Sequence, residues 1–149
     1  MLTPSKRGQY ALRAIYELAR RKDEGPTKVS TIASAQAIPQ RFLEVILNQL
    51  KGSGLVESKR GFYGGYTLAR APERITVGDV LRYLQKDTET KRCIACVSQK
   101  ACPFTDNCAF SSLWLRVKDA AFDIYDKTTM QDLLNTNEPA AFTKPTPVG

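Results

Sequence analysis

The sequence predicts a mainly α-helical protein that carries one two-stranded β-hairpin. Three observations lead to this fold class. Apolar residues recur at helical spacing in several segments, a glycine-rich basic stretch separates two short β-prone runs, and a long amphipathic segment follows a group of cysteines. With 149 residues, the chain is long enough to bury a core without disulfide staples.

Helical spacing predicts a first helix over residues 6–21, which ends at the polar turn KDEGP. Its apolar stripe consists of Ala11, Ile15, Leu18 and Ala19. A second, short helix is expected over residues 30–37, because Ser30 can cap its start and the sequence IPQ breaks the chain after it. The segment therefore predicts two helices separated by a short polar connection.

A third helix is expected over residues 39–52, with Pro39 in its first turn. Its apolar stripe consists of Leu43, Ile46, Leu47 and Leu50. Its opposite face carries Arg41, Glu44, Val45 and Asn48. The second and third helices and the tight turn between them predict a helix-turn-helix.

The stretch LVESKRGFYGGYTLA, residues 55–69, predicts a β-hairpin with a glycine-rich tip. A hairpin in this position is a wing, so the elements together predict a winged helix-turn-helix with a two-stranded wing. Thr76 is then expected to cap a helix that reaches Lys86. The apolar stripe of that helix consists of Val77, Val80, Leu81 and Leu84.

Residues 109–127 predict a long helix with apolar residues on more than one face. Because little chain remains to cover them, a dimerisation helix is favoured over a helix buried in its own domain. A short helix is expected over 128–134. The predicted organisation is a DNA-binding domain at 1–86, a cysteine-rich segment at 87–108, the dimerisation helix and following short helix at 109–135, and a proline-containing, disordered tail at 136–149.

The net charge of +7 is distributed unevenly along the chain. Residues 1–86 hold 15 Lys and Arg against 7 Asp and Glu, a balance of +8, whereas residues 87–149 hold 7 against 8, a balance of −1. A one-sided basic excess is typical of a domain that binds a polyanion. A basic, solvated surface without a partner is the alternative.

The sequence also bears on location. The longest stretch without a formal charge, residues 29–40, has 12 residues and is shorter than the roughly 18 of a membrane span. Arg13 interrupts the apolar residues near the N-terminus, which therefore lacks the apolar core of a signal peptide. We expect a cytoplasmic protein with no membrane partner.

Polar and basic residues that could contact double-stranded DNA fall into three groups. On the third helix, Arg can pair with guanine, Asn or Gln with adenine, and Glu with cytosine, whereas the wing and the start of the second helix suit phosphate contacts. The predicted DNA-binding residues are Thr27, Lys28, Ser30, Gln40, Arg41, Glu44, Asn48, Lys59, Arg60 and Tyr63. Solvated polar residues on an amphipathic helix, and a simple capping role for Ser30, are the alternatives.

All four cysteines lie in one short segment with the spacing C-x2-C-x5-C-x5-C: Cys93, Cys96, Cys102 and Cys108. Structural disulfides are rare in the cytosol, so metal or redox chemistry is the leading interpretation. The single CxxC and the absence of histidine fit a structural zinc site poorly. An iron-sulfur cluster is therefore favoured, and a zinc site and a thiol or disulfide switch stay open.

Three motifs carry a resemblance that extends over nearly the whole chain: I-P-x-x-F-L-E, G-L-V-x-S-x-R-G and G-G-Y-x-L. With the cysteine segment and the following LW helix, the chain resembles the IscR-like winged helix-turn-helix transcription regulators, whose relatives include NsrR and CymR. The resemblance implies a homodimer, joined through the long helix, that binds a palindromic operator. It also implies an iron-sulfur cluster, with [2Fe-2S] favoured and [4Fe-4S] possible.

The cysteine segment departs from the family pattern at the fourth ligand. Cys96, Cys102 and Cys108 resemble the ligand set of IscR, but Ser111 occupies the position of its histidine. The acidic residue that NsrR recruits near its N-terminus is also missing, because Gly8 and Gln9 occupy that region. Cys93 is an additional thiol that could complete an all-cysteine site.

The sequence therefore predicts a transcription regulator without catalytic activity, whose operator binding responds to an iron-sulfur cluster sensing redox state, iron or cluster supply. The alternative is a regulator of the same fold without a cluster, which uses its cysteines as a thiol switch or zinc site. A redox enzyme or electron carrier is a third hypothesis. It would leave the basic N-terminal part and the wing unexplained.

Overall fold

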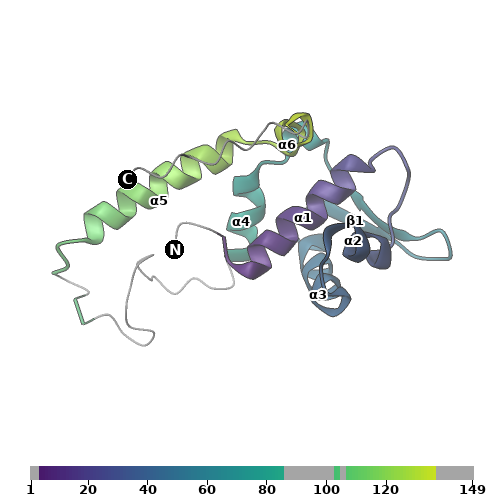
Figure 1. Cartoon of the computed structure of the whole chain (residues 1–149), viewed down its shortest axis with the longest axis horizontal. Helices are drawn as coiled ribbons and strands as arrows, with labels where there is room; N and C mark the ends of the chain where they lie inside the picture. The colour runs from purple at the N-terminus through teal and green to yellow at the C-terminus, as the bar shows by residue number, and fades with distance from the viewer. Residues whose placement is uncertain (1–3, 86–102, 105–106, 137–149) are drawn as a thin grey trace, which may run out of the picture.

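The computed structural model describes residues 4–85, 103–104 and 107–136 (Figure 1). Some predictions fall outside this part of the chain. They concern the helix end at Lys86, the disorder of residues 137–149, and Cys93, Cys96 and Cys102. The elements are α1 (Lys6–Arg20), α2 (Val29–Gln36), α3 (Gln40–Lys51), β1 (Val56–Lys59), β2 (Gly65–Leu68), η1 (Pro72–Arg74), α4 (Val77–Gln85), α5 (Ser111–Lys127) and α6 (Met130–Asn135). The mainly helical fold class with a two-stranded wing is confirmed.

The hydrophobic core lies between α1 and the helices that surround it. Ile15 of α1 is fully buried together with Ile32 of α2 and Leu43 and Leu47 of α3. These residues belong to the apolar stripes of helices that pack against one another. The predicted first and third helices are confirmed to within one residue at each end.

The second helix begins one residue earlier than predicted. Lys28 is its N-cap and makes no side-chain capping hydrogen bond, so Ser30 is an exposed residue of the first turn and not the cap. The helix ends at Gln36, and its C-cap Ala37 adopts a left-handed conformation with φ 51°. The amide of Ile38 then donates to the Ala33 carbonyl at 3.0 Å, which closes the turn that leads into α3.

The wing is an antiparallel hairpin in which Val56 pairs with Leu68 and Lys59 with Gly65. A backbone bridge attaches it to the loop before α2, since Thr27 and Tyr66 exchange two hydrogen bonds of 2.9 and 2.8 Å. Gly65 is required at this crossing, because a Cβ atom there would lie 2.4 Å from the Thr27 carbonyl oxygen. The wing is therefore fixed to the helical core at its base.

Helix α4 begins with the predicted cap. The Thr76 hydroxyl accepts from the Asp79 amide at 3.0 Å, and the Asp79 carboxylate accepts from the Thr76 amide at 3.1 Å. Just before this helix, the backbone of residues 75–77 pairs with residues 128–130. The cap thus lies where residues 75–77 meet residues 128–130, which come much later in the sequence.

The last helix starts two residues later than predicted, because residues 128 and 129 are extended and pair with the segment before α4. Thr129 caps α6, and the first residue of the helix, Met130, is fully buried in the core. Helix α6 contacts α1 and η1. The sequence groups this helix with the long helix, whereas its packing places it against the N-terminal core.

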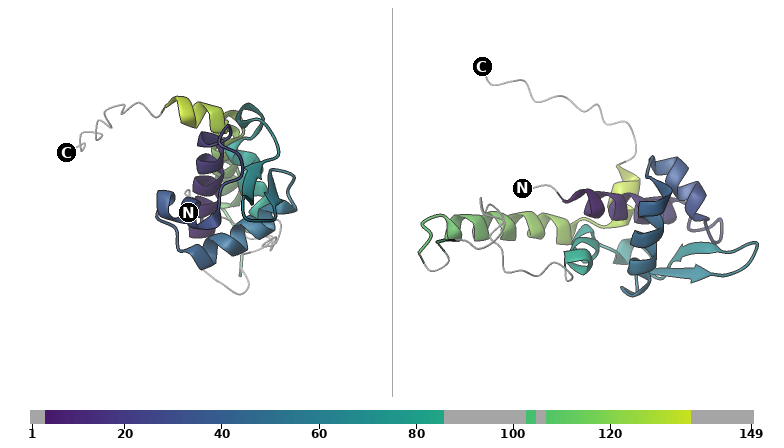
Figure 2. Two further views of the ribbon diagram at one scale, coloured as in Figure 1. Left: turned by 90° about the vertical axis from the view of Figure 1, so that its right-hand side faces the viewer. Right: turned by 90° about the horizontal axis from the view of Figure 1, so that it is seen from below.

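Helix α5 extends away from the rest of the molecule at the end opposite the wing (Figure 2). It contacts α4 and lacks fully buried residues along its whole described length. Large apolar side chains remain exposed on it, namely Leu113, Leu115 and Ile124. Within the described ranges, no helix is both long enough and apolar enough to cross a bilayer.

Candidate nucleic-acid interface

Helix α3 presents an exposed polar face opposite its buried stripe. The side chains of Gln40, Arg41, Glu44 and Asn48 are all exposed on it. The Gln40 Nε2 donates to Glu44 Oε1 at 3.1 Å, which joins two of these residues along the helix. All four therefore lie on the surface of the helix that a winged helix-turn-helix inserts into the major groove.

The far end of α3 is attached to α1 and α4. The Tyr83 hydroxyl of α4 donates to the Gln49 carbonyl at 3.0 Å, and the Arg7 guanidinium of α1 donates to the Gln49 side chain. These contacts, together with the buried Leu43 and Leu50, hold the helix from its inner side. The outer side is left open to a partner.

The tip of the wing combines basic and aromatic side chains in a tight turn. Lys59, Arg60, Phe62 and Tyr63 are exposed, the last two by 80% and 86%. The Phe62 and Tyr63 rings meet edge to face, with centroids 5.1 Å apart. A Cβ atom at Gly64 would lie 2.2 Å from the Lys59 carbonyl oxygen, so the turn requires glycine there.

The structure brings Lys28 to the wing. Its Nζ lies 5.1 Å from the centre of the Phe62 ring, within the range of a cation–π contact. Lys28 is also the N-cap of α2. The start of the second helix therefore contacts the wing tip, although the two are more than 30 residues apart in the sequence.

Thr27 is the one predicted contact residue that the structure places in the interior, since it is only 7% exposed. Its backbone holds the wing through Tyr66, as described above. Ser30 is exposed and belongs to a shallow surface depression with Arg21, Thr31 and Ser34. Ser34, one helical turn after Ser30, is also exposed in this depression.

Two apolar residues on α3 were also missed as contact candidates. Phe42 and Val45 are apolar, yet they are 64% and 66% exposed and do not belong to the core. The helical spacing already places Val45 among the polar residues of the outer face, at one turn from Arg41. The sequence therefore predicted the exposed position of Val45, but it did not mark Val45 or Phe42 as a contact residue.

Glu17 holds α1 against α2 from within the protein. Its carboxylate is fully buried and accepts from Arg20 at 2.9 Å, from Arg21 at 2.6 Å and from Gln36 at 2.8 Å. Burial by itself raises the pKa of Glu17, but the hydrogen bonds from Arg20, Arg21 and Gln36 outweigh it and lower the pKa below its ordinary value. Glu17 is therefore a charged anchor for the helix-turn-helix.

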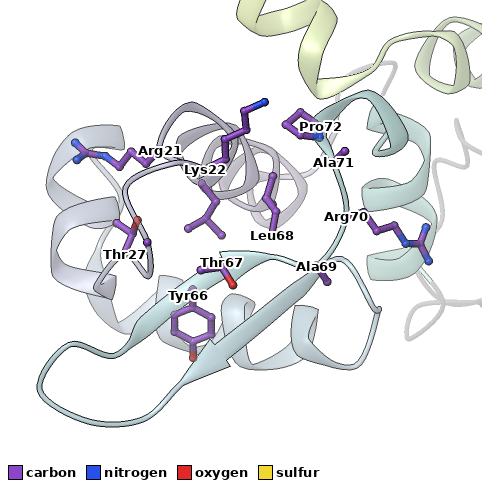
Figure 3. A pocket seen from close by; sticks show the side chains of 12 residues that line it. Arg21, Lys22, Thr27, Tyr66, Thr67, Leu68, Ala69, Arg70, Ala71 and Pro72 are labelled. Atoms are coloured by element: carbon purple, nitrogen blue, oxygen red, sulfur yellow. The ribbon is translucent and has the colours of Figure 1, made fainter.

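A cavity of about 330 Å³ lies at the base of the wing, between β2 and the end of α1 (Figure 3). Three basic residues belong to its lining, namely Arg21, Lys22 and Arg70, and their side chains point in different directions, away from one another. Arg21 is already paired with Glu17 and Glu24. The cavity therefore does not gather its positive charge around one point.

Of the four cysteines, the structure describes Cys108, which lies half-buried just before α5. Its carbonyl oxygen accepts from the Ser111 amide at 3.3 Å and from the Ser111 hydroxyl at 3.0 Å. The Ser111 hydroxyl is thus a donor to the backbone at the start of the helix. The other three cysteines lie outside the described residues.

Comparison with known proteins identifies relatives over almost the whole chain. A family model described as "Rrf2: Iron-dependent Transcriptional regulator" matches residues 4–136. The regulator CymR of Bacillus subtilis is 35% identical over 129 residues, which cover 87% of each chain. The regulator IscR of Pectobacterium carotovorum is 31% identical over 134 residues, 90% of this chain and 80% of the relative.

Two solved structures agree with this result. The structure of T. potens IscR superposes with a TM-score of 0.75 at 31% identity, and the match covers 96% of this chain and 93% of that one. The structure of CymR, named the global cysteine regulator of B. subtilis, gives 0.71 at 37% identity, with coverage of 91% and 98%. These relatives are named as transcriptional regulators and not as enzymes.

Proposed function

This chain belongs to the Rrf2 family of transcriptional regulators, and we propose that it acts as a homodimer that binds a palindromic operator in double-stranded DNA through α3 and the wing. The observation that carries the proposal is the exposed polar face of α3, and the contact of Lys28 with Phe62 at the basic wing tip supports it. The basic excess of residues 1–86 supports the same partner.

In the proposed complex, the two parts of the surface have different tasks. The outer face of α3 contacts base edges in the major groove, where its hydrogen bonds distinguish sequences. The residues that make these contacts are Gln40, Arg41, Glu44 and Asn48. The start of α2 and the wing contact the phosphate backbone, through Lys28, Ser30, Lys59, Arg60 and Tyr63. Thr27 contributes indirectly, because its backbone fixes the wing. Base contacts then determine specificity, and phosphate contacts determine orientation and general affinity.

We assign the dimer contact to α5. The apolar side chains of this helix lie exposed in the single chain, and the helix extends from the core at the end opposite the wing. Pairing two such helices would bury these side chains and hold the α3 helices and wings of the two protomers at a fixed separation. Two-fold symmetric half-sites about one helical turn apart, or a multiple of it, follow from this arrangement.

Salt-dependent DNA binding tests the proposal. The slope of log affinity against log salt concentration should be steep and negative, and DNase footprints should cover a two-fold symmetric site. Replacing Lys59 and Arg60 together with Ala should make the slope shallower, because two phosphate contacts are lost. A footprint on an asymmetric site with one chain per duplex would contradict the proposal.

We further propose that a cluster of iron and sulfide on Cys93, Cys96, Cys102 and Cys108 modulates operator binding. The donor set supports this assignment, because it is rich in thiolates and contains no histidine, as clusters prefer. Cys108 lies at the start of α5, so a change at the cysteines could reach the dimer helix directly. When bound, the cluster would supply a redox-sensitive and iron-sensitive state.

A regulator without a cluster is a second candidate function. The relative CymR, at 35% identity, has a solved structure whose name describes it as a cysteine regulator, and it favours this alternative. The cysteines would then act as a thiol switch or a zinc site. Anaerobically purified protein separates the two hypotheses: iron and sulfide in near-equal amounts with visible absorbance support the cluster, whereas colourless protein with full operator affinity supports the alternative.

A further inference from the structure

The outer face of α3 contains an apolar residue where polar residues are expected. Val45 is 66% exposed and lies four residues after Arg41 and three before Asn48. At this spacing, all three side chains lie next to one another on one side of the helix. Val45 therefore lies between Arg41 and Asn48 along the outer side of α3.

The packing of the chain does not explain this valine. The core side of α3 consists of Leu43, Ile46, Leu47 and Leu50. Val45 is absent from both the core and the apolar residues that pack against the core from the side. A β-branched residue is also a weaker helix former than the charged or long residues that usually occupy an exposed position.

An apolar side chain can recognise only one feature of the major-groove edge. The bases present hydrogen-bond donors and acceptors there, together with the C5-methyl group of thymine. Valine can neither donate nor accept a hydrogen bond, whereas the neighbouring Arg41 and Asn48 can do so. Phe42, three residues before Val45 and 64% exposed, extends the apolar surface along the helix.

We propose that Val45 contacts the C5-methyl group of a pyrimidine in each half-site, with Phe42 flanking the contact. This inference rests on the proposed function, since it requires α3 to enter the major groove. The methyl group can belong to thymine or to 5-methylcytosine. Specificity would then combine hydrogen bonds from Arg41 and Asn48 with one apolar contact between them.

Replacement of thymine by deoxyuridine removes only the methyl group and provides a direct test. Each thymine pair of the operator, at symmetric positions, is replaced in turn, and the affinity of the full chain is measured by fluorescence anisotropy. One position per half-site should weaken binding by about fifteenfold, because the symmetric replacement removes two buried methyl groups at about fourfold each. In the Val45→Ala variant, deoxyuridine at this position should have no effect.

Two controls make the result specific. Lys59→Ala should lower affinity for every duplex yet keep the penalty for deoxyuridine, because the wing does not contact that methyl group. Val45→Ile should also keep the penalty, since it preserves an apolar branched side chain. The thermal unfolding midpoint of Val45→Ala should match that of the unmodified chain, because the position is exposed.

A second set of duplexes separates the two sources of the methyl group. At the sensitive position, the cytosine pair is compared with its 5-methylcytosine counterpart, and a gain of similar size on methylation supports methyl recognition. The tighter of the thymine and 5-methylcytosine duplexes identifies the source. Equal binding of cytosine and 5-methylcytosine would overturn the proposal.

Failure of this inference differs from failure of the proposed function. If the chain binds its operator and Arg41→Ala changes base preference, while no deoxyuridine position depends on Val45, only the methyl contact is wrong. If Arg41→Ala also leaves base preference unchanged, α3 is not the reading helix, and both proposals fail.

Discussion

The guanidinium of Arg82 on α4 forms a two-point ion pair with the carboxylate of Asp126 on α5, and one of its two contacts measures 2.7 Å. The same guanidinium lies 4.7 Å from the centre of the Phe122 ring. A Cβ atom at Gly78 would collide with the Asp126 carboxylate in its present position, so the glycine leaves room for this carboxylate beside α4. This contact fixes the C-terminal end of α5 to α4.

Loss of this ion pair should loosen the end of α5. The hydrogen bond from Arg82 lowers the pKa of Asp126, so the pair is complete at neutral pH and is lost as the pH falls below the ordinary range of an aspartate. Asp126→Asn should increase amide hydrogen exchange over the last two turns of α5. Asp123→Asn is the control, since Asp123 pairs only along its own helix with Lys127 among the described residues. Equal exchange in both variants would contradict this role.

Replacement of Glu17 should destabilise the fold most strongly at neutral pH. Because its folded-state pKa lies below its ordinary value of 4.5, its contribution is complete above that pH and is lost as the pH falls through the folded-state value. Glu17→Gln should lower the free energy of unfolding by about 1–3 kcal/mol at pH 7. Urea unfolding, followed by circular dichroism, measures the loss. The difference from the unmodified chain should shrink below pH 4.5, and Glu24→Gln, at an exposed position, should change little.

A side chain at Gly65 should detach the wing. Its Cβ would lie within 2.4–2.9 Å of three backbone atoms of Thr27, so Gly65→Ala has to break the bridge between Thr27 and Tyr66. We expect a loss of about 1–3 kcal/mol in stability and weaker binding to all DNA sequences. Gly61→Ala is the comparison, because a Cβ there meets no described atom within 4 Å and adds only backbone strain. A larger effect for Gly61 than for Gly65 would argue against the bridge.

The reading helix and the wing should differ in the kind of binding they control. Arg41→Ala should change which bases are preferred, at a cost of about 1–3 kcal/mol for the cognate base. Arg60→Ala should reduce affinity for all sequences alike, because phosphates carry no sequence information. Selection from a library of randomised duplexes measures both effects. If Arg60→Ala altered the preferred site and Arg41→Ala did not, the two roles would be reversed.

The cysteines should contribute unequally if the proposed cluster is present. Cys102→Ala should abolish visible absorbance and leave the fold intact, because the described core contains no cysteine. Cys93→Ala should weaken or convert the cluster. Ser111→Ala should have little effect, since the Ser111 hydroxyl donates to the Cys108 carbonyl. Anaerobic spectra with iron and sulfide analysis provide the measurement. Retention of the cluster in Cys93→Ala and its loss in Ser111→Ala would indicate a serine ligand instead.

The sequence by itself determined the helices, the wing and the outer face of α3. These features depend on local patterns: the i, i+3, i+4 spacing of Leu43, Ile46 and Leu47, and the glycine-rich tip between two β-prone runs. The cap at Thr76 was predictable for the same reason, because Asp79 lies at the spacing of a capping box. Neighbouring residues did not decide every local feature, because Lys28 and not Ser30 is the N-cap of α2.

Only the tertiary structure decided how distant segments meet. Residues 75–77 pair with residues 128–130, which delays the start of α6 and buries Met130 in the core. Thr27 became a buried backbone anchor and Lys28 a neighbour of Phe62, because the wing folds back onto the start of α2. The partners in these contacts are far apart in the sequence, so no local period marks them. Their pairing depends on how the helices pack around the core.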